Sequence, residues 1–322
     1  MKHIVWVGDG LTTELAGGKG RSLDTLARMG LRVPAAFVVT TEAYRAAVSG
    51  TLAAELDRRV ARLRPDADMT EFETAAQSIR DWLFAQTEGH SAAPEIRAAY
   101  QKLTREGDRA VAVRSSSAAE DSAQHSFAGE HDSYLGIVGE DEVCDAVRRC
   151  WASLFTARAI SYRAREGVAG DAMAVVVQRM VDARAAGVFM TLNPVNGDRS
   201  KVVVESVWGL GEPLVSGEVT PDRFVVDKVS GEIISREVAS GQVGPSLTDD
   251  EILELLDIAR TVERHAGTPQ DGEFAIDDSG IHLVQARPET VWSAKPTHRV
   301  TDGKTDAMAH VLRVMTGTKP KN

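Results

Sequence analysis

The stretch that decides the fold is Val111 to Gly136, VAVRSSSAAEDSAQHSFAGEHDSYLG. The apolar residues Val111 to Val113 predict a strand that delivers Arg114 and then breaks into small hydroxyl and glycine residues. A fixed positive charge followed by exposed backbone N–H groups suits a polyphosphate ligand. His125 and His131 lie in the same loop, but no second ligand has the spacing of a metal site, so we interpret both as loop residues without a chemical role.

The composition bounds the class of protein. The 322 residues suffice for two domains or one large composite domain. With 37 basic and 47 acidic side chains the net charge is −10, which argues against nucleic acid or an anionic membrane as the main partner but allows a nucleotide in a local positive pocket. Cys144 and Cys150 are six residues apart in a helical pattern, so we expect free core thiols. The apolar run within residues 1–8 is too short for a signal peptide. The longest apolar stretch, Ala172 to Val177, has six residues and cannot span a bilayer, so we expect a cytoplasmic protein.

The order of the predicted elements indicates an α+β fold. The first half is mostly helical, with helices expected over 17–29 and 141–165 and within 52–105. From about residue 172 the chain becomes rich in strands, and one further helix begins at a capping box and ends before Gly267. Thr248 and Glu251 form that box. The boundary between the two halves is expected within residues 178–184.

The glycine-rich segment Gly17-Gly18-Lys19-Gly20 opens the first long helix. A lysine at a glycine-rich helix start can place its ammonium and nearby backbone N–H groups on a phosphate. The spacing is not that of a P-loop, because the Gly-x-x-x-x-Gly-Lys-Ser/Thr pattern is missing. In isolation, a tight turn with a solvated lysine is the favoured interpretation of the segment.

A predicted β-hairpin over residues 271–287 carries a candidate metal site. A three-residue turn that pairs Asp277 with Ile281 puts Glu273 opposite Gln285, with Cβ atoms about 5 Å apart. Alternation then places Gln285 and Arg287 on the face of Glu273. A carboxylate and an amide oxygen side by side suit Mg²⁺, and the guanidinium can neutralise charge on a phosphoryl group. The alternative is a surface Glu–Arg pair worth at most about 1 kcal/mol.

Two other segments are less specific. Gln178-Arg179-Met180-Val181 ends a strong β run, where Gln178 and the backbone can meet a purine edge and Met180 can lie against the ring. The segment Gly209 to Leu214 is not a dinucleotide-binding fingerprint, because Leu214 replaces the third glycine and Pro213 blocks the helix. It is either a loop on the phosphate side of a site or a plain turn.

Together these motifs resemble the nucleotide-binding module of the phosphoenolpyruvate synthase and pyruvate phosphate dikinase family, which includes rifampicin phosphotransferase. The matching segments occur in family order over residues 17–288. They are Gly17 to Gly20, Val113 to Ser116, Ala119 to Asp121, Ser126 to Glu130, Gly187 to Pro194, Trp208 to Glu212, Val215 to Gly217, Pro221-Asp222 and Gln285 to Pro288.

The resemblance implies an ATP-grasp-like fold in which two subdomains clamp ATP, and we expect these over residues 1–180 and 181–293. After Trp292 the chain becomes polar apart from a short apolar face within Met308 to Met315, so we expect a tail over 294–322 with a short helix there. It also implies a role for individual residues. The phosphates would be held by Lys19, Arg114, Gly129 and Ser133, and adenine would meet Gln178 and Met180. Mg²⁺ would be bound by Glu273 and Gln285. Arg287 would contact the phosphates in transfer, and Arg114 and Lys19 would be further catalytic groups. Ser133 stands where the family usually has threonine, and Gly272 stands where an apolar residue is commoner, which should loosen that strand.

Family members also carry a phosphorylated histidine in a Thr-Ser-His or Gly-Gly-x-x-x-His context and a separate acceptor-binding domain, and this sequence has neither histidine motif. The resemblance therefore predicts an ATP-binding, phosphoryl-donating subunit that cleaves ATP to AMP and phosphorylates a histidine on a partner subunit. The expected final acceptor is a phenol or cresol, as in phenylphosphate and cresol-phosphate synthase systems. The alternatives are a split phosphoenolpyruvate synthase, an antibiotic phosphotransferase subunit or a non-catalytic ATP-sensing module.

Overall fold

The computed structural model describes residues 2–105, 109–117, 133–166, 172–240 and 244–293. By its internal contacts the chain divides into two units, Met1–Glu289 and Thr290–Asn322. The first unit contains every helix and strand described below. The predicted helix near residues 308–315 lies outside the described residues. No helix among the described residues is long and apolar enough to cross a bilayer.

The first sheet is built from the N-terminal half of the chain. Its five strands run in the order β1-β2-β5-β3-β4, and each neighbouring pair is antiparallel. The strands are β1 (Ile4–Trp6), β2 (Ala36–Val39), β3 (Val111–Ser116), β4 (Ser133–Ile137) and β5 (Ala174–Arg179). The helices of this half are α1 (Thr13–Arg28), α2 (Thr41–Ala47), α3 (Gly50–Ala61), α4 (Met69–Gln86), α5 (Ala93–Leu103), α6 (Glu140–Ala152) and α7 (Ala157–Glu166).

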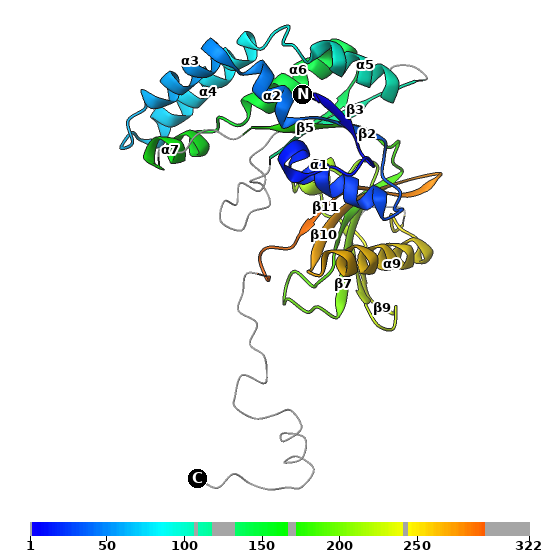
Figure 1. Ribbon diagram of the computed structural model, residues 1–322. Helices are drawn as coiled ribbons and strands as arrows, with labels where there is room; N and C mark the ends of the chain where they lie inside the picture. The colour runs from blue at the N-terminus through cyan, green and yellow to red at the C-terminus, as the bar shows by residue number, and fades with distance from the viewer. Residues whose placement is uncertain (1, 106–108, 118–132, 167–171, 241–243, 294–322) are drawn as a thin grey trace, which may run out of the picture. The chain divides into compact units, whose positions relative to one another are not determined.

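Both faces of the first sheet are buried. Phe37, Val113 and Val177 pack on one face in a large core cluster with residues of α4, α5 and α6. Val38 and Val176 face the other way and pack with α1 (Figure 1). Because β2 and β5 are covered on both sides, they read as nearly continuous apolar runs rather than alternating ones.

The second sheet is built from the C-terminal half and has the order β11-β10-β6-β7-β8-β9. Its strands are β6 (Ala185–Met190), β7 (Lys201–Trp208), β8 (Asp222–Asp227), β9 (Ile233–Glu237), β10 (Gln270–Asp277) and β11 (Gly280–Pro288). The long helix α9 (Asp249–Ala266) packs on one face, and a short helix α8 (Glu212–Val215) follows β7. The capping box of Thr248 and Glu251 at the start of α9 is confirmed, as is the end at Gly267.

Two predicted helices differ from the structure. The helix expected over 17–29 belongs to α1, which begins earlier and is kinked at Gly17, where φ is 68°. The single helix expected over 141–165 is two helices, α6 and α7. The chain turns between them, and the hydroxyl of Thr156 accepts a hydrogen bond from the N–H of Ala159 at 3.1 Å, which caps the second helix.

The β10–β11 hairpin shows why the predicted pairing succeeded although its turn was wrong. Asp277 pairs with Gly280 rather than with Ile281, so the turn is one residue shorter than expected. A bulge between Glu273 and Phe274 compensates, because β11 carries Val284 as an extra residue there. Glu273 is therefore opposite Gln285, as predicted.

Candidate nucleotide site

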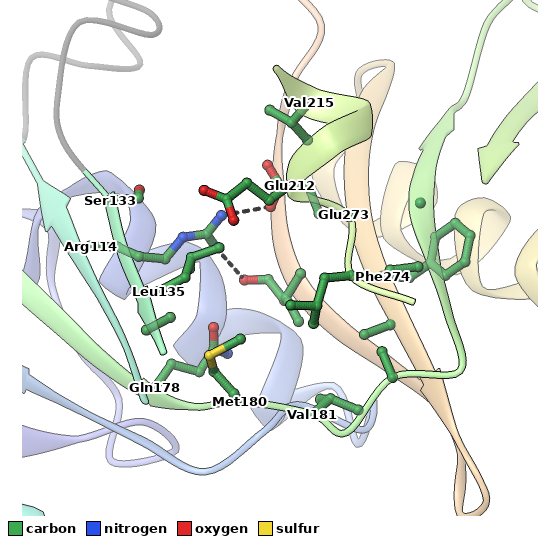
Figure 2. A pocket seen from close by; sticks show the side chains of 18 of the residues that line it. Arg114, Ser133, Leu135, Gln178, Met180, Val181, Glu212, Val215, Glu273 and Phe274 are labelled. Atoms are coloured by element: carbon green, nitrogen blue, oxygen red, sulfur yellow. Dashed lines mark hydrogen bonds and ion pairs between the residues drawn. The ribbon is translucent and has the colours of Figure 1, made fainter. Parts of the chain in front are cut away.

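A cavity of about 320 Å³ is lined by residues of both sheets and of the segment that links them. One side is formed by Arg114, Ser133, Leu135, Gln178 and Met180, and the opposite side by α8, Glu273 and Phe274 (Figure 2). Val284 also lines the cavity. The mixture of apolar walls with a few converging polar groups is typical of a small-molecule site.

Arg114 is the polar centre of this cavity. Its guanidinium lies 2.7 Å from a carboxylate oxygen of Glu273 and donates a second hydrogen bond, of 3.1 Å, to the carbonyl of Val284 (Figure 2). Val284 is the bulge residue of β11, so the irregularity presents its carbonyl to the arginine. The Arg114 side chain is 15% exposed and that of Glu273 is 27% exposed, so this ion pair is only partly solvated and joins the first sheet to the second.

The glycine-rich segment is held against the end of β3. A Cβ atom on Gly17 would lie 2.0 Å from the carbonyl oxygen of Ser116, so no other residue fits there without movement. The hydroxyl of Ser116 bridges the carbonyl of Ala16 and the N–H of Gly20. Lys19 donates from its ammonium to the carbonyl of Ser115 at 2.9 Å and does not line the cavity. The structure thus brings Lys19 beside the strand of Arg114 but not to the cavity wall.

The candidate metal pair lies in an adjoining cavity of about 170 Å³, which shares Glu273 and Val215 with the first. Gln285 and Arg287 line it together with two further carboxylates, Asp271 and Glu205. The described residues contain no group of three or more histidine, cysteine or acidic side chains that could hold a metal ion by themselves. Glu273 and Gln285 fit a Mg²⁺ ion whose remaining ligands are phosphate oxygens and water, since Mg²⁺ keeps several waters.

Asp271 and Arg287 are Cα partners on the hairpin, and the Nε atom of Arg287 lies 3.8 Å from a carboxylate oxygen of Asp271. Burial raises the pKa of Asp271 to about 6, with a smaller contribution from Glu289, while Arg287 opposes the shift. The Arg287 side chain is 52% exposed, so its guanidinium is open to a ligand in the smaller cavity.

Gln178 and Met180 line the large cavity next to the linker between the sheets. Gln178 is 2% exposed, and its side-chain nitrogen has no hydrogen-bond partner among the described residues. A buried amide without a partner leaves a donor for a ligand. Met180 is held by two contacts: its N–H donates to the carbonyl of Ala110 and its sulfur accepts from the N–H of Gly136, both at 3.0 Å.

The structure brings most of the expected site residues together. Arg114, Ser133, Gln178, Met180 and Glu273 line the large cavity, and Glu273, Gln285 and Arg287 line the smaller one. Gly129 lies outside the described residues, as do His125 and His131. Leu210, Gly211 and Glu212 line the large cavity, which favours the ligand-side loop over the plain turn for that segment.

Several lining residues were not singled out from the sequence. Glu205 is an acidic residue within the apolar run of β7, and Asp271 is two residues before Glu273 in β10; each pattern could have marked a polar face. Leu135 and Val284 gave no comparable signal. Gly272 has a packing role, because a Cβ atom there would lie 2.2 Å from the ring of Phe189.

Comparison with known proteins decides the family. Residues 13–308 match the family described as pyruvate phosphate dikinase, AMP/ATP-binding domain. The chain belongs to this family. Its architecture, two antiparallel sheets with helices, is the α+β class expected from the sequence.

Two relatives illustrate the match. Rifampicin phosphotransferase of a Streptomyces species is 42% identical over 300 residues, which are 85% of this chain and 34% of that protein. Phosphoenolpyruvate synthase of Aeropyrum pernix is 38% identical over 341 residues, which are 87% of this chain and 41% of that protein. The chain thus spans less than half the length of these relatives.

Solved structures give more distant similarity. D-alanyl-alanine synthetase A from Vibrio cholerae is 11% identical, with a TM-score of 0.33 over 83% of this chain and 54% of that chain. PH1788 from Pyrococcus horikoshii is 14% identical, with a TM-score of 0.36 over 86% of this chain and 93% of that chain.

Proposed function

We propose that this protein is the ATP-binding, phosphoryl-donating subunit of a split dikinase-type phosphotransferase. Membership of the AMP/ATP-binding domain family and the meeting of Arg114 with Glu273 in one cavity support this proposal most directly. The two subdomains would be residues 1–180 and 181–293, since the strands change from the first sheet to the second between Arg179 and Ala185.

Each group of residues has a separate task in the proposed reaction. Leu135, Gln178 and Met180 would bind adenine, with the unpartnered amide nitrogen of Gln178 donating to the ring. Arg114, Ser133, Gly129 and Lys19 would orient the phosphates. Lys19 must leave the carbonyl of Ser115 or reach past it to do so, because it does not line the cavity.

Glu273 and Gln285 would hold Mg²⁺, which supplies charge neutralisation on the phosphates. Arg287 would stabilise the negative charge that develops on the transferring phosphoryl group. Arg114 would exchange Glu273 for phosphate oxygens when the nucleotide enters, because one guanidinium fork serves both kinds of oxygen acceptor.

The phosphoryl acceptor in this proposal is a histidine on a partner subunit. The imidazole attacks the β-phosphorus of ATP, the bond from that phosphorus to the oxygen of the α-phosphate breaks, and AMP leaves while the imidazole carries the β- and γ-phosphoryl groups. Water then cleaves the bond between these two groups, the γ-phosphate leaves as inorganic phosphate, and one phosphoryl group stays on the histidine. The partner then transfers the phosphoryl group to its own acceptor, for which we propose a phenol or cresol, as in the degradation of aromatic compounds. The similarity to rifampicin phosphotransferase and phosphoenolpyruvate synthase supports an antibiotic or pyruvate as the alternative acceptor.

The test is the release of AMP from ATP and Mg²⁺ after addition of a partner that carries the histidine domain. Formation of AMP with a phosphorylated partner supports the proposal. ATP binding without AMP release under these conditions would instead indicate an ATP-sensing module. Absence of heat on mixing with Mg²⁺ and adenine nucleotides in calorimetry would exclude both functions.

A further inference from the structure

Strand β11 carries two residues of the proposed site, Gln285 and Arg287, and it is an edge strand. The order of the second sheet places β10 on one side of it, and no strand of the described residues pairs with its other side. Three of its backbone groups are instead bound by residues of the N-terminal half of the chain. An edge strand without a second neighbour depends on such contacts for its position.

Two of these contacts precede Gln285. The N–H of Leu283 donates to the carbonyl of Arg32 at 2.8 Å, and the carbonyl of the bulge residue Val284 accepts from Arg114 at 3.1 Å. Arg32 follows helix α1 in the chain, and Arg114 lies in β3. The part of β11 before the metal-binding candidate is therefore fixed by a loop and by a side chain of the nucleotide cavity.

Ser22 supplies the third contact, after Gln285. Its hydroxyl donates to the carbonyl of Ala286 at 2.5 Å, at the short end of the range for an O–H···O hydrogen bond. This carbonyl belongs to the peptide group that joins Ala286 to Arg287, and a peptide group is planar. The hydroxyl of Ser22 therefore fixes the orientation of the plane from which the backbone of Arg287 continues.

Helix α1 holds Ser22 at this place because the helix contacts both sheets. It lies beside β11 (Figure 1), and its Leu26 packs in one core cluster with Leu283 and Ala286. Lys19, three residues before Ser22, donates to a carbonyl of β3 at 2.9 Å. Residues three and four positions apart share one face of a helix, so a single face of α1 reaches the strand of Arg114 and the strand of Arg287.

The side chain of Arg287 is only weakly held by its own contacts. It is 52% exposed, and its Nε atom lies 3.8 Å from the carboxylate of Asp271, which is longer than a hydrogen bond. The direction in which this guanidinium extends into the smaller cavity therefore depends on the backbone that carries it, and Ser22 is bound to that backbone.

We propose that Ser22 is a positioning residue for phosphoryl transfer. Its hydroxyl sets the peptide group before Arg287 so that the guanidinium reaches the transferring phosphoryl group in the smaller cavity. Ser22 lines neither the large nor the smaller cavity, so it acts through Arg287 and not by contact with the nucleotide. The proposal rests on the proposed function, because it gives Ser22 a part in the same transfer.

The experiment compares single-turnover AMP release and ATP binding in Ser22→Ala and wild type. The rate should fall roughly 10-fold, since a small displacement of a catalytic group costs at least that much, while the affinity for ATP stays unchanged. Ser22→Thr keeps the hydroxyl and should restore the wild-type rate. An unchanged rate in Ser22→Ala, or a threonine variant as slow as the alanine variant, overturns the proposal.

Thr25→Ala is the matched control. Thr25 lies in the same helix, and its hydroxyl also donates to a backbone carbonyl, but that carbonyl is the one of Arg21 within α1. This variant should release AMP at the wild-type rate. A decrease equal to that of Ser22→Ala would overturn the proposal, because any lost hydroxyl of α1 would then have the same effect.

A double-mutant cycle separates positioning from a general effect on the fold. If Ser22 acts through Arg287, Ser22→Ala should not slow the reaction further once Arg287→Ala is present. An additional 10-fold decrease in the double variant overturns the proposal, since the serine would then act on the rate without the guanidinium.

A readout that needs no activity tells a failure of this proposal from a failure of the proposed function. In protein labelled with ¹³C-carbonyl alanine and ¹⁵N-arginine, the Ala286–Arg287 peptide gives one resonance, assigned by its change in Arg287→Lys. It should move in Ser22→Ala, return in Ser22→Thr and stay in place in Thr25→Ala. If wild type releases AMP and the resonance does not move in Ser22→Ala, only the positioning role is overturned. If wild type releases no AMP, the proposed function is overturned, and the role of Ser22 in transfer with it.

Discussion

The two sheets of this protein differ in what covers them. In the first sheet, β2 and the first five residues of β5 are buried throughout, whereas the edge strand β4 is half-buried or exposed. The second sheet buries one face under α9 and leaves the other polar, so β8 alternates strictly between buried and half-buried residues. The uncovered face is where Glu205, Glu273 and Gln285 lie. On this face the short helix α8 leaves room for the carboxylates to line a cavity, whereas the first sheet contributes Arg114 from within β3.

This comparison predicts that variants on the polar face of the second sheet reduce activity rather than folding. Replacing Arg287 with alanine should reduce the rate of AMP formation roughly 100-fold or more, the scale of losing one donor to transition-state charge. ATP binding should be retained, since Arg287 is half exposed and lies outside the large cavity. The measurement is single-turnover AMP release with the histidine-bearing partner.

The control for Arg287→Ala is Arg199→Ala, an exposed arginine of the same half that lines neither cavity. It should retain the wild-type rate. Unchanged turnover in Arg287→Ala would refute the assigned role of the guanidinium.

For residues in the helices that pack on the first sheet, the comparison of the two sheets predicts that substitutions change the stability of the fold and not the activity. His90 packs edge-on against Trp151, with ring centroids 4.7 Å apart, and burial lowers its pKa to about 4, with help from Arg148, Arg97 and His3. An unfolded histidine has a pKa of about 6.5, so on acidification the unfolded chain takes up the proton first. The free energy of unfolding should fall by roughly 2 kcal/mol between pH 7 and pH 5 from this residue.

Urea denaturation of wild type and His90→Leu at both pH values measures this contribution. The leucine variant should lose that part of the acid sensitivity, because it has no group to protonate. An equally steep loss of stability in both proteins would show that His90 is not the source.

A smaller effect, on the affinity for ATP, is expected when one carboxylate on the polar face is replaced by an amide of the same shape. Glu273→Gln can still accept the hydrogen bond from Arg114 but offers Mg²⁺ a neutral oxygen. The affinity for ATP in the presence of Mg²⁺ should fall about 10-fold, the equivalent of about 1.4 kcal/mol. Affinity measured with EDTA should not fall, since no metal then bridges Glu273 to the phosphates.

Glu237→Gln is the matched control for Glu273→Gln. Glu237 is exposed on the edge strand β9 and lines neither cavity. If the affinity for ATP depends equally on Mg²⁺ in wild type, Glu273→Gln and Glu237→Gln, Glu273 does not belong to the metal site.

The smallest expected effect is at the strand ends of the first sheet. Ser133 pairs with Arg114 and lines the large cavity. Ser133→Ala should weaken ATP binding by a few-fold, corresponding to one neutral hydrogen bond of about 1 kcal/mol. Ser133→Thr keeps the hydroxyl and should bind as wild type does. A threonine variant as weak as the alanine variant would show that shape, not the hydroxyl, matters at this position.

The sequence by itself determined the features that depend on neighbouring residues. The capping box of Thr248 and Glu251 needs only a three-residue spacing. The alternation in β10 placed Glu273 with Gln285 on one face, even though the predicted turn was wrong. Such patterns are local, because helix and strand periods repeat over a few residues.

Only the tertiary structure decided which distant residues meet. Arg114 and Glu273 are 159 residues apart and form an ion pair only because β3 and β10 both reach the cavity, and the bulge at Val284 supplies the second acceptor. The break of the expected 141–165 helix into α6 and α7 was not visible in the apolar spacing either. These outcomes depend on the packing of whole layers, which sums many weak contacts over long sequence separations and leaves no periodic signal in the chain.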